Sequence, residues 1–112
     1  MTPITGGPLV DPSGQALSDV TVSFELVNCS QHPVSVVDAI SSDVVSGSVI
    51  STTDATGVLN ASLWPNSRGV TKSQYRVTIA VPFVTPFLIL VPDQATPLQL
   101  FEAMQSGGLQ PC

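Results

Sequence analysis

The sequence predicts an all-β protein folded as a single antiparallel β-sandwich of about seven strands, with a short helix near its C-terminal end. Two observations predict this fold class. Short stretches in which apolar and polar side chains alternate recur along the chain, and Gly, Pro, Asp or Asn residues bound them. The spacing of these turn signals is typical of a sandwich, and 112 residues are enough for one hydrophobic core but not for two.

The N-terminal part of the chain contains the clearest strand. Residues 2–10 are expected to form a first strand, and Asp-Pro-Ser-Gly at residues 11–14 has the sequence of a type I turn. Residues 20–27 then form a strand in which apolar and polar positions alternate. Its apolar positions are Val20, Val22, Phe24 and Leu26, and the polar positions between them are Thr21, Ser23 and Glu25. One face of this strand therefore belongs to the core.

The middle of the chain is less regular. Residues 34–37 can form a short strand, and residues 38–43 are either a loop or one irregular turn. Residues 44–53 are expected to form a longer strand that contains Gly47. A glycine inside a strand often marks a bulge, so we expect one at this position.

Three further strands follow in the second half. A second Asp-x-x-Gly turn at residues 54–57 leads into a strand at residues 58–64. After an exposed loop at residues 67–73, residues 74–81 alternate again, and residues 87–91 form a last strand that is apolar throughout.

The tail changes from a strand period to a helix period. Residues 96–99 fit a helix start, since a threonine N-cap is followed by proline at the first position and glutamine at the third. The apolar stripe of this helix consists of Leu98, Leu100, Phe101 and Met104. The helix either plugs one end of the sandwich or docks on a neighbouring subunit. We divide the chain into a sandwich domain at residues 1–92 and a tail at residues 93–112, which is part of that domain or an assembly arm.

Low charge is the main signal in the composition. Charged residues make up 10% of the chain, against about a quarter in a typical globular protein, which favours a surface covered by partner subunits. The net charge of −5 argues against nucleic-acid binding. The basic residues Arg68, Lys72 and Arg76 either offset nearby acids on a solvated hairpin or form a contact patch for an acidic partner. No apolar run is long enough for a transmembrane helix, and the absence of a signal peptide favours synthesis in a cytoplasm.

The inventory of reactive side chains is small. The only histidine, His32, stands in a loop, and there is no Gly-x-Ser-x-Gly nucleophile motif. Cys29 and Cys112 are too few to hold zinc but can form one disulfide. We therefore expect no enzymatic activity, no metal and no cofactor. Trp64 and Tyr75 either anchor a partner or stack on a sugar, or they belong to the core.

Two sets of residues resemble known families. Residues 10–24, with the sequence VDPSGQALSDVTVSF, resemble the opening of transthyretin-like and carboxypeptidase-regulatory-like β-sandwiches. Residues 53–57, 63–66, 75–77 and 91–93, before an apolar helix, are similar to modules of tailed-bacteriophage virion proteins. Such modules occur in tail fibres, tail-tip attachment proteins and small head or collar decorations. The resemblance spans residues 2–104, and it implies an immunoglobulin-like or transthyretin-like sandwich.

The phage resemblance implies a function. It implies a non-enzymatic structural protein of the virion, made in the host bacterial cytoplasm, whose partners are other virion proteins. It favours a homo-oligomer such as a trimer or a hexamer, without nucleic acid or membrane. The alternative is an adhesin-like module that binds a carbohydrate or a receptor through Trp64 and Tyr75. The candidate contact residues are Trp64, Arg68, Lys72, Tyr75, Leu98, Phe101 and Met104.

Overall fold

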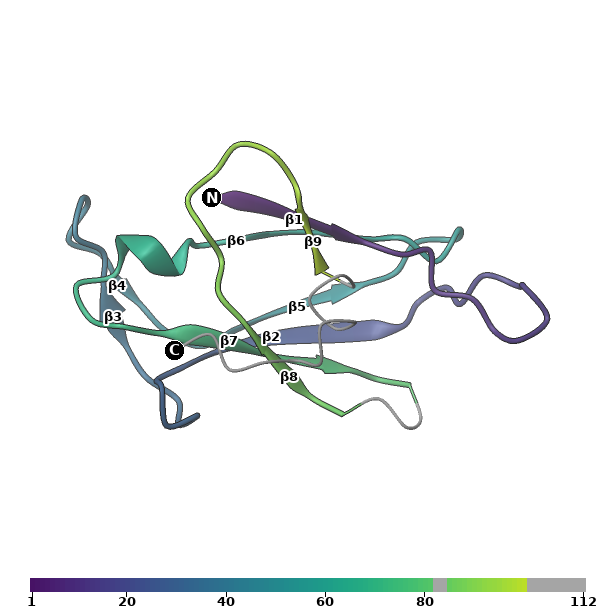
Figure 1. The fold of residues 1–112 in the computed structure, drawn as a ribbon, viewed down its shortest axis with the longest axis horizontal. Helices are drawn as coiled ribbons and strands as arrows, with labels where there is room; N and C mark the ends of the chain where they lie inside the picture. The colour runs from purple at the N-terminus through teal and green to yellow at the C-terminus, as the bar shows by residue number, and fades with distance from the viewer. Residues whose placement is uncertain (82–84, 101–112) are drawn as a thin grey trace.

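The computed structural model describes residues 1–81 and 85–100, and within them nine strands form an all-β sandwich (Figure 1). One layer is a three-stranded sheet in the order β6-β1-β9, formed by Leu59–Leu63, Thr2–Gly6 and Leu98–Gln99. The other layer is a four-stranded sheet in the order β5-β2-β7-β8, formed by Ser48–Thr52, Thr21–Val27, Gln74–Ile79 and Phe87–Ile89. The pair β3 (Val36–Val37) and β4 (Val44–Val45) and the 3-10 helix η1 (Asn66–Arg68) lie at one end (Figure 1). The predicted fold class is confirmed.

The core lies between the two layers and consists of the apolar faces that the alternation predicted. On β2, Val22, Phe24 and Leu26 are at most 2% exposed. The register places them opposite Ile79, Val77 and Tyr75 of β7. The other sheet contributes Ile4, Leu59 and Leu63. Burial of each large apolar side chain contributes about 2 kcal/mol, so these paired rows supply most of the stabilisation.

The two predicted Asp-x-x-Gly turns are confirmed. The N–H of Gly14 donates to the carbonyl of Asp11 at 2.9 Å, and the N–H of Gly57 donates to the carbonyl of Asp54 at 3.0 Å. In each turn the Asp carboxylate accepts hydrogen bonds from the hydroxyl and the N–H of the residue two positions on, and these bonds lower its pKa. Gly57 has a φ of 81°, and a Cβ there would overlap the carbonyl oxygen of Leu9.

Gly47 divides the predicted strand at residues 44–53 in two, where we expected only a bulge. β4 pairs with β3, whereas β5 pairs with β2 in the four-stranded sheet. Gly47 has a φ of 95°, a conformation that redirects the chain, and its carbonyl accepts a hydrogen bond from the N–H of Leu26 at 3.0 Å. Gly47 therefore does mark an interruption of the strand, as predicted. At this interruption the chain passes from the β3–β4 pair to the four-stranded sheet.

The start of the predicted C-terminal helix is wrong. Leu98 and Gln99 form β9, which pairs with β1 in parallel, so the sandwich is not purely antiparallel. Pairing with β1 overrides the local capping signal of Thr96 and Pro97 because tertiary contacts outweigh propensity in so short a segment. Leu100 is fully buried. The predicted continuation of the helix from residue 101 lies outside the described residues.

Candidate interaction surface

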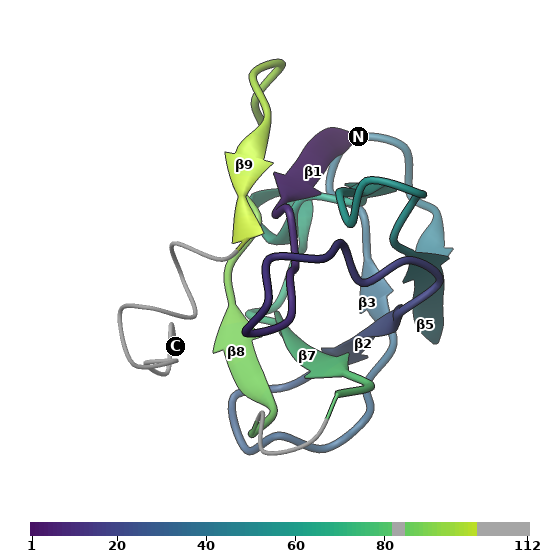
Figure 2. The ribbon, with the colours of Figure 1, turned by 90° about the vertical axis from the view of Figure 1, so that its right-hand side faces the viewer.

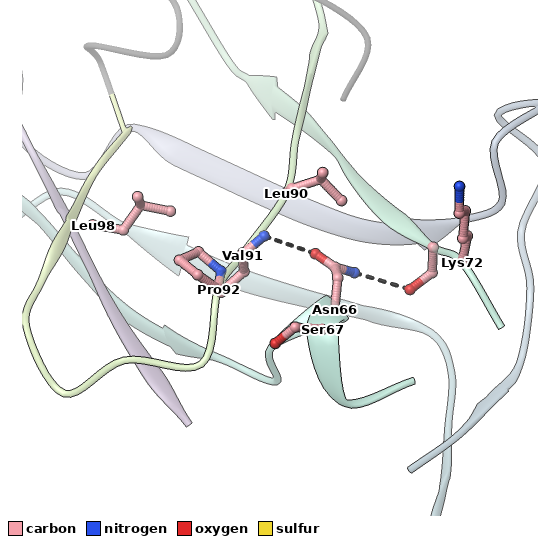
Figure 3. Close-up of a pocket in the computed structure, with 8 residues that line it drawn as sticks. Asn66, Ser67, Lys72, Leu90, Val91, Pro92 and Leu98 are labelled. Atoms are coloured by element: carbon pink, nitrogen blue, oxygen red, sulfur yellow. Dashed lines mark hydrogen bonds between the residues drawn. The ribbon is translucent and has the colours of Figure 1, made fainter. Parts of the chain in front are cut away.

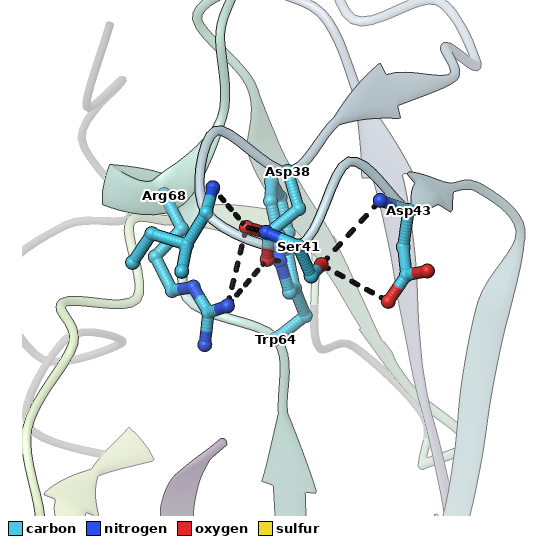
Figure 4. Close-up of polar contacts among 6 residues, drawn as sticks. Asp38, Ser41, Asp43, Trp64 and Arg68 are labelled. Atoms are coloured by element: carbon cyan, nitrogen blue, oxygen red, sulfur yellow. Dashed lines mark hydrogen bonds and ion pairs between the residues drawn. The ribbon is translucent and has the colours of Figure 1, made fainter.

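A buried carboxylate lies at the end of the sandwich that carries β3, β4 and η1. Asp38 directly follows β3 and is 3% exposed. It accepts a hydrogen bond from the indole Nε1 of Trp64 at 2.7 Å, and the guanidinium of Arg68 lies 3.0 Å away (Figure 4). It also accepts hydrogen bonds from the N–H groups of Ile40 and Ser41, at 2.8 and 3.1 Å. A carboxylate can be buried at low cost only when its oxygens are satisfied in this way.

These donors hold the pKa of Asp38 well below its ordinary value of 3.8. The hydrogen bond from Trp64 is the largest cause, burial acts against it, and the N–H groups of Ile40 and Ser41 and the Arg68 side chain lower the pKa further. Asp38 is therefore ionised at neutral pH. The three side chains Asp38, Trp64 and Arg68, here called the Asp38 cluster, join the β3–β4 turn to the end of β6 and to η1.

Four exposed apolar side chains adjoin the Asp38 cluster, and we call them the end patch. They are Val37, Ile40, Val44 and Val70, which are 42%, 74%, 67% and 65% exposed.

Three members of the end patch form a row. Val37 is directly opposite Val44 in the β3–β4 ladder. On its other side, the carbonyl of Val37 accepts a hydrogen bond at 2.9 Å from the N–H of Val70, next to an antiparallel bridge between Asp38 and Gly69. Residues opposite each other in antiparallel ladders project from the same face, so the three valines lie side by side.

The Asp38 cluster fixes this patch in place. The N–H of Ala39 donates to the carbonyl of Arg68 at 2.7 Å, so backbone and side-chain contacts both join the β3–β4 turn to η1. Isolated exposed apolar residues are ordinary on protein surfaces, whereas a contiguous and ordered group is typical of a protein–protein contact. The arrangement offers apolar contact area and no reactive group.

A pocket of about 600 Å³ lies between β9 and the segment that follows β8 (Figure 3). Its lining includes Asn66, Ser67, Lys72, Ser73, Leu90, Val91, Pro92 and Leu98. The amide of Asn66 donates to the hydroxyl of Ser73 at 3.0 Å and accepts from the N–H of Val91 at 2.9 Å. This side chain therefore joins η1 to the segment after β8. Lys72 is the one charged side chain in the described lining, so these residues contain no acid–base pair.

Trp64 and Tyr75 are core residues. They are 9% and 4% exposed, and the hydroxyl of Tyr75 donates to the carbonyl of Trp64 at 2.8 Å. Burial raises the pKa of the Tyr75 hydroxyl. Exposed fractions this small leave little ring surface on which a sugar could stack, so the structure gives no support to the adhesin-like alternative.

The three basic residues have different surroundings. Arg68 belongs to the Asp38 cluster, and Arg76 pairs with Glu25 of β2 at 3.3 Å and donates to the carbonyl of Gln31 at 2.6 Å. Lys72 is exposed at the pocket. Two of the three cations therefore neutralise acids of the same chain, as the solvated-hairpin interpretation expects.

Of the three candidate contact residues in the tail, only Leu98 lies within the described residues. Leu98 lies in β9 and lines the pocket. Phe101 and Met104 lie outside the described residues. Cys29 is not a free thiol, and Cys112, the other cysteine, also lies outside them.

Within residues 1–81 and 85–100, no group of three or more His, Cys, Asp or Glu side chains is placed to hold a metal ion. In the same part of the chain no helix has the length and apolar character that spanning a membrane requires. No protein-family model matches the sequence, and neither does any curated protein.

The Asp38 cluster was not predicted from the sequence. Its members are 26 and 30 residues apart, and Asp38 stood in a segment with no clear period. One local signal was present, because an Asp whose side chain accepts N–H groups two and three positions on is a typical turn residue. That signal predicts a turn, and it does not predict the long-range partners.

Proposed function

We propose that this protein is a non-enzymatic structural protein of a tailed-phage virion, a tail-fibre, collar, adaptor or capsid-decoration component. It acts through protein–protein contacts, and the end patch is its main contact surface. The phage assignment rests on the sequence resemblance at residues 53–57, 63–66, 75–77 and 91–93. The low charge of the chain agrees with it, because 10% charged residues leave few groups that repel a partner.

The observation that carries the contact role is the end patch itself. Val37, Val44 and Val70 form an apolar row, and Ile40 beside it is 74% exposed. Because the Asp38 cluster orders this turn before any partner arrives, binding loses little conformational entropy there. A preorganised apolar surface suits a component that occupies a fixed place in an assembly.

Particle incorporation tests this function. Virions of the phage that carries the gene are purified by density gradient, and the chain is quantified in them by mass spectrometry. The wild-type chain is expected at a fixed copy number relative to the major capsid protein. Its absence from intact particles would contradict the virion assignment.

A variant pair tests the surface. In a gene-deleted phage complemented from a plasmid, Val44→Lys is expected to reduce the copy number at least about tenfold, because a charge enters an apolar contact. The control is Val10→Lys in the loop between β1 and β2, at the opposite end of the sandwich (Figure 1), where the side chain is 50% exposed. Circular dichroism verifies that both variants fold. Equal incorporation of both variants would exclude the end patch as the contact.

A further inference from the structure

The free edge of β5 is a second surface, separate from the end patch. β5 ends the four-stranded sheet on one side, and β8 ends it on the other (Figure 2). Leu26 and Gly47 are a hydrogen-bonded pair at 3.0 Å where the β2–β5 ladder begins. Since such pairs recur at every second residue of an antiparallel ladder, the N–H and C=O groups of Ser48, Ile50 and Thr52 point away from β2. In the described part of the chain β5 pairs with β2 alone.

Two features that usually protect an edge strand, proline and charged side chains, are missing from β5. Residues 44–53 contain neither a proline nor a charged residue. Val49 is 40% exposed and Ile50 is 67% exposed. β5 has five uncharged residues, three of them β-branched, and its outward backbone groups have no strand partner within the described residues, so it is a template for another strand.

We propose that β5 pairs antiparallel with β5 of a second copy of this chain, about a two-fold axis at Ile50. In this register Ile50 is opposite Ile50 of the copy, and Ser48 is opposite Thr52. The outward N–H groups at these three positions then meet outward C=O groups of the copy, so the two sheets join into one. The two Ile50 side chains lie on the same face and cover each other.

Charge favours a second copy as the occupant. The chain carries a net charge of −5, so two copies repel each other over most surfaces. The seam avoids this repulsion because residues 44–53 are uncharged. The one carboxylate of β2, Glu25, lies one strand away and is paired with Arg76 at 3.3 Å. Self-pairing therefore places no like charges directly opposite each other.

The test is the mass in solution, measured by light scattering after size exclusion over a range of protein concentrations. The wild-type chain is expected to approach twice the 11.6 kDa of one copy as concentration rises. Ile50→Lys is expected to raise the dissociation constant at least about tenfold, because lysines on an edge strand prevent strand pairing. Ile50→Thr keeps the β-branched shape and is expected to weaken the dimer less.

Val70→Lys is the matched control. Val70 is 65% exposed, close to the 67% of Ile50, but it belongs to the end patch. It is expected to keep the dimer, while Ile50→Lys is not. A wild type that stays monomeric at millimolar concentration, or a dimer that neither Ile50 variant weakens, would overturn the pairing. Neither result would bear on particle incorporation, so the two proposals fail separately. If Ile50→Lys does not fold, the wild type and Ile50→Thr still decide the question.

Discussion

The four-stranded sheet ends in β5 on one side and in β8 on the other, and the two edges differ in both sequence and burial. The three residues of β8, Phe87, Leu88 and Ile89, are 4–6% exposed. Pro86 precedes this strand and Pro92 follows shortly after it. β5 has five residues, no proline in or next to it, and no buried side chain.

The difference shows that an edge strand can serve a fold in two ways. β8 contributes apolar area to the core, and its short length and flanking prolines limit further pairing. β5 extends the sheet but leaves four of its five side chains exposed, and within the described residues its outer backbone groups have no strand partner. The same holds for the neighbouring end patch, whose valines are apolar yet exposed. The end patch and β5 are therefore two surfaces that partners can cover, while β8 belongs to the interior.

The largest expected effect is on the β8 side. Phe87→Ala is expected to lower the free energy of unfolding by about 3 kcal/mol, because it removes a buried aromatic ring and leaves a cavity. Ile50→Ala on β5 is the matched comparison and is expected to change it by less than about 0.5 kcal/mol in the monomer. Urea unfolding measures both. Equal losses would mean that β5 is as much a part of the core as β8.

A smaller effect is expected where the exposed region is anchored. Trp64→Phe keeps most of the ring but removes the Nε1 donor to Asp38. The expected loss is about 2 kcal/mol, because a buried charged acceptor loses a partner. Amide exchange at Ile40 and Ser41 is expected to become faster, since their N–H groups bind the same carboxylate. Unchanged exchange there would show that the Asp38 cluster does not order the end patch.

The contribution of Asp38 to the free energy of unfolding is expected to fall at acidic pH. Its pKa in the folded protein lies below the ordinary value of 3.8. The stabilisation is therefore fully present above that value and is lost as the pH falls below it towards the pKa of the folded state. The free energy of unfolding, measured with urea at pH 7, 4 and 2.5, is expected to fall mainly between pH 4 and pH 2.5. Asp38→Asn is expected to show a shallower loss, and an equally steep one would assign the acid sensitivity to other carboxylates.

The smallest expected effect on stability comes from the end patch. Val44→Ser is expected to change the free energy of unfolding by less than about 0.5 kcal/mol, because its side chain is 67% exposed. Val36→Ser is the comparison on the inner face of the same pair, where the side chain is 1% exposed, and it is expected to cost at least about 2 kcal/mol. Thermal unfolding measures both. Similar losses would contradict the assignment of the two faces.

Alternation of side chains predicted the strands well where one face is buried. Residues 20–27 and 74–81 correspond closely to β2 and β7, because a half-buried strand must alternate. The pairing of β9 with β1 was not predictable, since two residues carry no period and Thr96 and Pro97 favour a helix start.

The surface was the least predictable part. The sequence left open whether Trp64 is exposed or buried, because its strand is followed by a loop. Its burial depends on packing in the core and on the acceptor that Asp38, 26 residues earlier, provides for Nε1. Exposure of Val44 and Ile50 was not predictable either, since valine and isoleucine favour strands in any position.

Amide hydrogen exchange of the wild-type chain, at low and at high protein concentration, tests the contrast between the two edges most directly. The amides of Leu88 and Ile89 in β8 are expected to exchange at the same rate at both concentrations. The amides of Ser48, Ile50 and Thr52 are expected to be unprotected in dilute solution and to become protected as concentration rises. Equal protection of these three amides at both concentrations would contradict the account of β5 as a surface for a second copy.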